Sequence, residues 1–285
     1  MCLYPKKVVR LNLVDEIGEQ VSKLVFCKNE ESRSIFVSNL LLPYTCVDLP
    51  CGKCVECLQQ KSIEWSYRIL LESSLYEKNC FCTLTYSQTD GELVKSDFQK
   101  FMKRLRKFLQ PTKIRFFACG EYGSKGHRPH FHCIIFGWHP NDLVLFNKKE
   151  KLYGSRILEK IWTHGFVSVS PLILETAKYC AKYLQKLNKL EDKKQQPFVL
   201  MSLNPGIGLD AFLEKKDSYL PTDKIYIDGH YVKIPRYFLD KLKKQANVAD
   251  LQKIEANRLN RLLKCDIMKK TEEELVLLRK KKERI

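Results

Sequence analysis

The sequence predicts an α+β fold in which an antiparallel sheet is covered by helices on one side. Between residues 80 and 190, strand-like and helix-like segments follow in the order strand, helix, strand, strand, helix, strand, helix. This order suits a ferredoxin-like or RNA-recognition-motif-like core. Apolar residues make up 44% of the 285 residues, enough for a buried core. A cysteine-rich extension precedes these segments, and a basic tail with helical spacing follows them.

The N-terminal extension, residues 1–61, begins with short apolar runs separated by charged residues. The runs at 7–14, 23–26 and 34–42 favour edge strands, and the sequence leaves their order open.

A cysteine cluster closes this extension. Cys51, Cys54 and Cys57 lie three residues apart, and Cys46 precedes them by five. Structural zinc takes four thiolate or imidazole ligands at short loop spacings, so these residues are a candidate zinc site. Cys46 is the expected fourth ligand, with Cys2, Cys27 or a remote residue as alternatives. A competing interpretation is that the three regularly spaced cysteines form one side of a helix start.

The core, residues 62–190, opens with a helix over 62–77 and a strand over 80–86. A second helix is expected over 96–109, where Pro111 ends it. Its outer face carries Lys103, Arg104 and Lys107. These cations are candidates for contacting DNA; an ordinary solvated helix face is an equally good interpretation.

Two histidines lie in the stretch Arg128-Pro129-His130-Phe131-His132, which leads into an apolar strand ended by Gly137. Side chains alternate between the faces of a strand, so His130 and His132 point to the same side. Two imidazoles in this position can bind one divalent cation. The alternative for such a pair is that one ring is packed and the other hydrogen-bonded. Arg128, just before the pair, is a candidate DNA contact.

The preceding strand, Ile114 to Cys119, leads into a glycine-rich turn that contains Glu121. If the two strands pair as a hairpin, Glu121 lies beside the histidines and completes a set of two imidazoles and one carboxylate. Such a set with open positions suits Mg²⁺ or Mn²⁺ on a phosphate, although imidazoles also bind other transition metals. A solvated turn residue is the alternative for Glu121.

A short helix at 156–164 and a strand at 166–170 precede the last core helix, which is expected over 171–190. Tyr179 and Tyr183, at positions i and i+4, share one face of that helix, and Lys182 lies three residues after Tyr179. Tyrosines at this spacing are more often half-buried packing residues than reactive groups.

The C-terminal region, residues 191–285, starts with a charged linker over 191–196. A hairpin that turns at Asp228-Gly229 follows. From residue 240 onward, Lys, Arg, Leu and Ile dominate a tail with partly helical spacing. The tail is suited to packing on the core, to binding a partner or to tracking DNA.

The chain is strongly basic, with 50 Lys and Arg against 33 Asp and Glu and a net charge of +17. Such a field attracts polyanions. No stretch reaches the roughly 18 apolar residues of a membrane span, and no apolar leader follows Met1, so nucleic acid is favoured over a membrane. Without a leader, the 12 cysteines indicate a reducing cytosol, where they are thiols or metal ligands rather than disulfides.

Five motifs in this order resemble those of a known group. They are similar to the motifs of replication initiators from small single-stranded DNA phages. The five motifs are Cys51 to Cys54, Thr83 to Tyr86, Gly120 to Gly123, Arg128 to His132 and Tyr179 to Tyr183. These phages are the Microviridae of gokushovirus type, and their initiators fall in the HUH endonuclease superfamily. The resemblance runs from Met1 to about Tyr237, and the combination is specific although each motif alone is weak.

The resemblance implies an HUH core of the α+β type above and a function. It implies a rolling-circle initiator that nicks single-stranded and origin DNA with a divalent metal held by Glu121, His130 and His132. Tyr179 and Tyr183 are then nucleophiles that form a 5′-phosphotyrosine link, and the displaced strand is rejoined into a circle. Lys182 is placed to stabilise the phenolate or the transition-state charge. We expect host replication machinery such as a helicase as partner, and the bacterial host cytoplasm as location.

Two other classes of function fit the same residues. A basic α+β sheet can be a non-catalytic nucleic-acid-binding module that stacks bases on aromatic side chains. The cysteine cluster can instead mark a zinc-containing DNA-binding regulator. Metal-dependent nicking separates the endonuclease from both.

Overall fold

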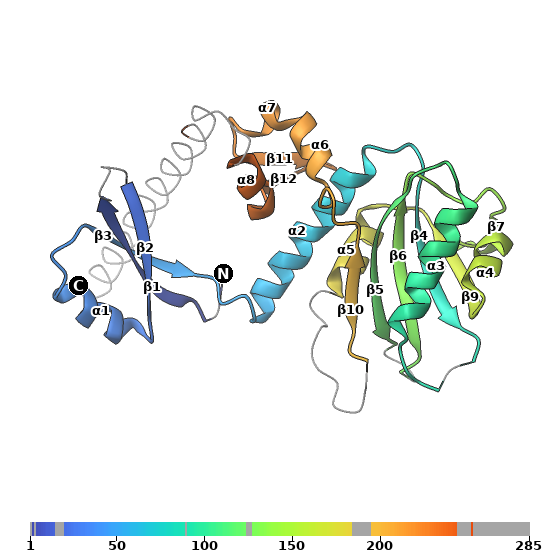
Figure 1. The fold of residues 1–285 in the computed structure, drawn as a ribbon, viewed down its shortest axis with the longest axis horizontal. Coiled ribbons are helices and arrows are strands. Elements are labelled where there is room, and N and C mark those ends of the chain that lie inside the picture. Colours follow the sequence, from blue (N-terminus) through green and yellow to red (C-terminus); the bar gives the residue numbers. More distant parts are fainter. Residues whose placement is uncertain are drawn as a thin grey trace, which may run out of the picture.

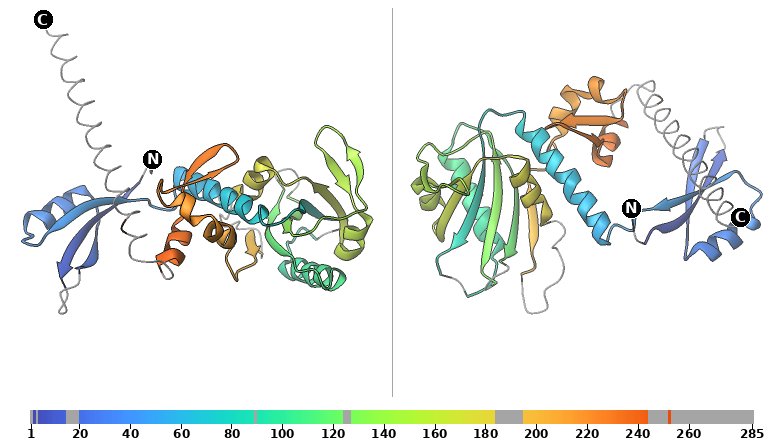
Figure 2. Two further views of the ribbon diagram at one scale, coloured as in Figure 1. Left: turned by 90° about the horizontal axis from the view of Figure 1, so that it is seen from above. Right: turned by 180° about the vertical axis from the view of Figure 1, so that it is seen from behind.

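The computed structural model describes residues 2, 4–14, 20–88, 90–123, 127–183, 195–243 and 252. Figures 1 and 2 show a small N-terminal sheet, a larger sheet and a C-terminal group of short elements. The helix α2, Val55–Ser73, runs between the two sheets.

The N-terminal sheet contains three antiparallel strands in the order β2-β1-β3. Their bounds are Lys6–Val14 for β1, Gln20–Cys27 for β2 and Tyr44–Leu49 for β3. The strand expected at 23–26 is confirmed as an edge strand, whereas the strand expected at 7–14 is present but lies in the centre of the sheet, paired on both sides. The strand expected at 34–42 is wrong, because α1 occupies Glu30–Ser38. The Asn29 side chain accepts a hydrogen bond from the Ser32 amide at 2.8 Å and so caps this helix, a local signal that outweighs the apolar run.

The large sheet contains seven antiparallel strands in the order β10-β5-β6-β4-β9-β8-β7. Its central part follows the chain order β4-α3-β5-β6-α4-β9, which is the βαββαβ order of a ferredoxin-like fold. The predicted α+β fold with an antiparallel sheet and a cysteine-rich N-terminus is therefore confirmed. The bounds are Asn79–Tyr86 (β4), Lys95–Phe108 (α3), Arg115–Tyr122 (β5), Pro129–Phe136 (β6), Arg156–Trp162 (α4) and Gly165–Ser170 (β9).

Three further strands extend the sheet at its two edges. The sequence favours a polar loop over 141–153, but this segment contains β7, Val144–Asn147, and leads into β8, Leu152–Gly154. At the other edge β10, Phe198–Met201, pairs with β5.

Helices cover both faces of the large sheet, whereas the sequence analysis expects them on one side. The two helices of the βαββαβ unit, α3 and α4, lie on one side and bury Phe98, Phe101 and Trp162 against it. The other face carries Phe117 and Ile134 and packs against α2 and α5, Leu174–Lys182. Because strand side chains alternate, His130 and His132 lie on this second face, beneath α5.

The C-terminal elements form a core of their own around Phe212, Ile225 and Phe238, to which α2 contributes Leu71. The hairpin predicted to turn at Asp228-Gly229 is confirmed. The bounds are Leu209–Glu214 (α6), Lys216–Tyr219 (α7), Lys224–Ile227 (β11), His230–Lys233 (β12) and Arg236–Lys243 (α8).

The proposed divisions after residues 61 and 190 stay predictions; α2 spans the first of them. Most of the predicted linker over 191–196 and of the helical tail lies outside the described residues, as does the predicted continuation of the tyrosine helix to residue 190. None of the described helices is both long and apolar enough to cross a membrane.

Candidate metal and tyrosine site

The candidate metal cluster is built by the pairing of β5 with β6. In this register Glu121 lies opposite His130, and Cys119 lies opposite His132. Glu121 and His132 are 5% and 4% exposed, whereas His130 is partly exposed. The hairpin that the sequence predicts thus brings the three candidate ligands together on one face.

The three ligand atoms form a small triangle. Glu121 Oε1 lies 2.9 Å from His130 Nε2 and 3.3 Å from His132 Nε2, and the two nitrogens are 3.0 Å apart. Ligands at right angles around an ion with bonds of about 2.1 Å lie about 3.0 Å from one another. The triangle therefore fits one face of an octahedral divalent site and leaves the opposite positions for other ligands. The cluster is compatible with metal binding.

Hydrogen bonds on the far side of each ring fix the direction of the histidines. His130 Nδ1 lies 3.1 Å from the carbonyl oxygen of Arg128, which only accepts, so Nδ1 carries a proton. When a cation replaces the proton that Nε2 shares with Glu121, the Nε2 lone pair is directed at the cluster. His132 Nδ1 lies 3.0 Å from Thr83 Oγ1 on β4. Such partners orient metal ligands and raise their basicity.

The surroundings of Glu121 also favour the ionised form of its carboxyl. Burial raises the pKa of its carboxyl, but hydrogen bonds from His130, His132 and Tyr183 outweigh burial and lower it to about 2. The group is therefore an anion at neutral pH, as a metal ligand must be.

The role of Thr83 gives a first test. The change Thr83→Val keeps the β-branched shape and removes the hydroxyl that faces His132. We expect the affinity for Mn²⁺ to fall by about 10- to 100-fold, the usual effect of losing a partner that orients a ligand. Calorimetric titration measures it, and Thr45→Val, an exposed site on β3, is the control. Equal affinities in the two variants would show that Thr83 only supports the strand.

The helix α5 and its C-terminal cap place both tyrosines over His132. The Tyr183 ring stacks on His132 with centroids 5.1 Å apart, and the Tyr179 ring meets the same imidazole edge-on at 5.0 Å. The two phenol rings are 5.3 Å apart. The shared helix face predicted for them is therefore present at the cluster, which brings both into reach of one bound group.

The two phenols differ in environment. Tyr179 is 46% exposed, whereas Tyr183 is 5% exposed. Burial raises the pKa of Tyr183, and its hydrogen bonds to Glu121 and Tyr179 raise it further. Burial also raises the pKa of Tyr179, but the hydrogen bond with Tyr183 counteracts it. Tyr179 is thus the more accessible phenol of the two.

Lys182, the predicted partner of the phenolate, lies in the last turn of α5 with an exposed side chain. Within the described part of the chain it forms no hydrogen bond or ion pair through that side chain, so its predicted role rests on sequence position alone.

The predicted DNA-binding cations divide into two pairs. Arg104 donates to the carbonyl oxygens of Ile161 and Trp162, at 2.7 and 3.0 Å, so it fastens α3 to α4. Arg128 donates to the carbonyl oxygens of Tyr86 and Ser87 and holds the β6 start against the end of β4. Both guanidinium groups are thus engaged in the fold. Their contact with DNA stays a prediction.

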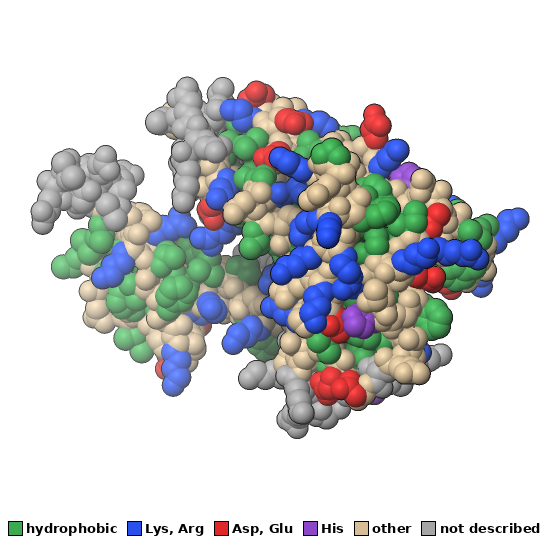
Figure 3. Space-filling view, turned by 45° about the vertical axis from the view of Figure 1, so that its right-hand side comes forward, with side chains coloured by type: hydrophobic (Ala, Val, Ile, Leu, Met, Phe, Trp, Pro, Cys, Tyr) green, Lys and Arg blue, Asp and Glu red, His purple; other side chains and the backbone are tan. Residues whose placement is uncertain are grey.

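Lys103 and Lys107 remain exposed on α3. That helix packs on the face of the sheet opposite the histidines, so these lysines do not border the metal cluster. Figure 3 shows Lys and Arg side chains gathered in a band over the larger of the two parts of the molecule visible in that view. Their role in DNA binding stays a prediction.

A second candidate metal cluster lies where the N-terminal sheet meets α2. It consists of Cys2, Cys51, Cys54 and Cys57, whose sulfur atoms all lie within 4.8 Å of one another. The sulfur of Cys2 is 3.7 Å from that of Cys54, and Cys51 is 3.9 Å from Cys57. Tetrahedral thiolates at about 2.3 Å from zinc lie about 3.8 Å apart, so the four sulfurs fit a structural zinc site.

The fourth member corrects the sequence analysis. Cys46, the expected ligand, is exposed on β3 and lies opposite Val9 outside the cluster. Cys2 takes its place because β1 pairs with β3 so that Lys6 lies opposite Leu49. This register brings the N-terminus to the start of the Cys51 loop. The choice of Cys2 over Cys46 therefore follows from the strand pairing and cannot be predicted from the spacing of the cysteines.

Backbone amides point at the sulfurs of this cluster. Cys51 Sγ accepts from the amides of Lys53 and Cys54 at 3.4 and 3.3 Å, and these bonds lower the pKa of the thiol to about 6. Gly52 supplies the left-handed turn that they require, with φ of +76°. Preformed thiolate character of this kind suits metal ligation.

Fold and site together define an α+β protein with a candidate metal centre flanked by two tyrosines. Residues 79–188 match a family of replication-associated proteins of the ORF2 type. The chain is 31% identical over 218 residues, 69% of its length, to "Replication-associated protein ORF4" of Chlamydia phage 1. It spans about half of that protein, 54%.

Two further relatives are matched over more of their length. The chain is 29% identical over 265 residues to "Replication-associated protein ORF2" of Spiroplasma virus 4, covering 86% of this chain and 81% of that protein. It is 32% identical over 218 residues to "Replication-associated protein VP4" of Bdellovibrio phage phiMH2K, covering 68% and 67%. No solved structure matches the chain significantly. The chain belongs to the family of replication-associated proteins of Microviridae-type phages.

Proposed function

We propose that the protein initiates rolling-circle replication of phage DNA by nicking one strand and holding its end on tyrosine. One observation carries the proposal: two phenol rings lie about 5 Å from the imidazole of His132, within a cluster of Glu121, His130 and His132 that fits a divalent cation. Membership of a replication-associated family supports the same role.

The reaction is a transesterification at phosphorus. The phenol oxygen of Tyr179 forms a bond to the phosphorus as the bond from phosphorus to the 3′ oxygen breaks, and that oxygen leaves as a 3′-hydroxyl after taking up a proton. The 5′-phosphate stays on the tyrosine, so the ester bond is conserved and the reverse attack by a 3′-hydroxyl rejoins a strand. No nucleotide cofactor is required.

The residues around the phenols suit this chemistry. A divalent cation, Mg²⁺ or Mn²⁺, would be held by Glu121, His130 and His132 and would polarise the scissile phosphate. The rings of Tyr183 and Phe81 both stack on His132, with centroids at 5.1 and 5.5 Å, and limit its motion. The partly exposed Tyr179 is open to an incoming strand.

The test uses a labelled single-stranded origin oligonucleotide. Incubation with the protein and Mn²⁺ is expected to give a species that survives denaturation and carries both protein and label. Mass spectrometry should place the nucleotide on Tyr179 or Tyr183. A non-catalytic binding module, or a zinc-containing regulator, would shift the oligonucleotide under native conditions and leave no adduct after denaturation.

We propose that the cluster of Cys2, Cys51, Cys54 and Cys57 binds one structural Zn²⁺. The site would join the N-terminus to the start of α2 and so fix the small sheet against the helix that leads to the core. One of the four sulfurs comes from Cys2, before the N-terminal sheet in the chain, and three come from residues after it. A bound zinc ion would therefore link the two ends of this sheet to each other.

Metal analysis tests the zinc site. Protein purified without chelator is expected to contain one zinc per chain, and Cys54→Ser to lose most of it, because three thiolates bind zinc less tightly than four. Cys46→Ser is the matched control and should keep full occupancy, since Cys46 lies outside the cluster. Zinc loss in Cys46→Ser but not in Cys54→Ser would contradict the proposed ligand set.

For the setting of this activity, we propose origin DNA as the substrate, host replication machinery such as a helicase as the partner and the bacterial host cell as the location. The large positive charge supports DNA as the ligand.

A further inference from the structure

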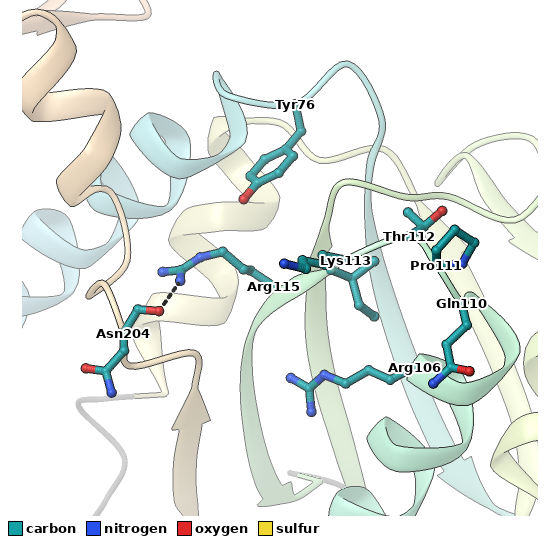
Figure 4. A pocket seen from close by; sticks show the side chains of 9 residues that line it. Tyr76, Arg106, Gln110, Pro111, Thr112, Lys113, Arg115 and Asn204 are labelled. Carbon is teal, nitrogen blue, oxygen red and sulfur yellow. Dashed lines mark hydrogen bonds between the residues drawn. The ribbon is translucent and has the colours of Figure 1, made fainter.

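Two neighbouring cavities lie away from the tyrosines. The first, of about 540 Å³, is lined by Tyr76, Arg106, Lys113, Arg115 and Asn204, among others. Figure 4 shows Arg106 reaching it from α3, and Lys113 and Arg115 from the segment that enters β5. The second cavity, of about 380 Å³, is lined by residues of α3, β5 and β10. Arg106 belongs to both walls, so we treat the two cavities as one trough, the Arg106 trough.

The trough lies at the opposite end of β5 from the metal cluster. Arg115 is the first residue of this strand, and Glu121 is six residues further on. At about 3.4 Å per residue, the two positions are about 20 Å apart. The α3 part of the trough also lies on the other face of the sheet. A ligand in the trough is therefore separate from the group that the tyrosines attack.

The walls of the trough carry unpaired positive charge. Lys103, Arg106 and Lys113 are exposed, and none forms an ion pair with another described residue. The lining residues of both cavities include no Asp or Glu. Arg115 is different, because its Nε lies 2.5 Å from Glu72 Oε1 and its other nitrogens donate to the carbonyls of Asn204 and Pro205. It forms a fixed wall, while the other three cations are free to bind an anion.

The floor of the trough is apolar and partly aromatic. Met102, Leu200 and Met201 line it, and the Phe116 ring lies 5.4 Å beneath the Arg106 guanidinium. Tyr76 borders the other end. Cations that neutralise a backbone, combined with aromatic and apolar groups for unpaired bases, are the features of single-strand-binding grooves. A duplex stacks its bases inside and offers nothing to such a floor.

We propose that the Arg106 trough binds a single-stranded segment of DNA distinct from the strand at Tyr179 and Tyr183. The inference rests on the proposed function in taking DNA as the ligand and in expecting a second segment of strand to be held. A replication initiator that keeps one DNA end on tyrosine must also hold a second segment of strand. The trough provides phosphate contacts for it on the side away from the reacting groups.

Binding measurements test the trough. The variant Arg106→Gln/Lys113→Gln removes two free cations without touching the Arg115–Glu72 ion pair. The control Lys149→Gln/Lys160→Gln removes the same charge from exposed positions outside the lining. Fluorescence anisotropy with a single-stranded oligonucleotide of about 30 nucleotides is recorded over a range of salt concentrations, without added divalent metal. Thermal melting verifies that both variants fold.

The slope of log K against log salt is the deciding quantity. Each lost phosphate contact on a single strand lowers its magnitude by about 0.7, so the trough variant should lose about 1.4 and the control close to nothing. Equal slopes in the two variants would overturn the proposal. An equal loss of affinity for duplex of the same length would also overturn it, because the trough would then bind DNA without regard to strandedness.

Photocross-linking gives a second measurement on the unaltered protein. An oligonucleotide with 5-iodouracil is expected to cross-link to a peptide that contains Phe116 or Tyr76; cross-links confined to other peptides would contradict the trough. Adduct formation at the tyrosines is scored separately on a short oligonucleotide. Failure of the wild-type protein to form an adduct rejects the nicking function and leaves the slope and cross-link results to decide the trough.

Discussion

Replacing His132 with Ala is expected to abolish nicking while most DNA binding remains. His132 offers one of the three candidate ligand atoms and lies against both phenol rings. A cation on the scissile phosphate contributes several kcal/mol of transition-state stabilisation, and each 1.36 kcal/mol is a factor of ten. The rate of adduct formation should therefore fall by about a thousandfold or more. Binding should change little, because it depends on the wider basic field.

Two companion variants separate chemistry from folding. His132→Ala leaves a void beside Phe81 and Tyr183, so Glu121→Gln, which keeps the size of the side chain and removes its charge, should reproduce the loss of nicking and of Mn²⁺ binding. His230→Ala, on the exposed β12, should behave as the wild type. Full nicking by His132→Ala in the presence of EDTA would reject a catalytic cation at this cluster.

The sequence predicts this site well because short-range geometry determines it. Alternation along one strand places His130 and His132 on the same face, and a hairpin between adjacent strands brings Glu121 to them. The spacing of Tyr179 and Tyr183 places both on one face of a helix. The spacing does not predict that Tyr183 is buried and Tyr179 is partly exposed, because this difference depends on how α5 packs on the sheet.

Most of the features that the sequence does not reveal come from contacts between distant segments. Cys2 joins the cysteine cluster through the pairing of β1 with β3, and Cys46 is excluded by the same pairing. The sequence also does not reveal that Arg104 and Arg128 donate to carbonyl groups of distant segments. The helix α1 replaces an expected strand because its Asn29 cap outweighs an apolar run. The Thr83 hydroxyl reaches His132 only because β4 pairs with β6.

The pair of tyrosines gives the second large effect, because the double variant Tyr179→Phe/Tyr183→Phe is expected to form no covalent adduct at all. Phe keeps the ring that packs on His132 and removes only the attacking oxygen. Each single variant should still form an adduct with the origin oligonucleotide, since the ring centroids lie only 5.3 Å apart and the proposed mechanism brings one phosphate to both phenols. The exposed Tyr179 should make the first attack, so Tyr179→Phe should form its adduct more slowly than Tyr183→Phe.

In the proposed mechanism, repeated rounds require both phenols. One tyrosine would hold the first 5′-end while the other cuts the regenerated origin, and the freed 3′-hydroxyl would then attack the first phosphotyrosine and close a circle. Each single variant should therefore release few closed circles in a replication assay, whereas Tyr226→Phe, on the remote β11 hairpin, should release as many as the wild type. The opposite outcome is that one single variant forms no adduct while the other completes many rounds like the wild type. That outcome would show that one tyrosine performs the chemistry and the other only packs against His132.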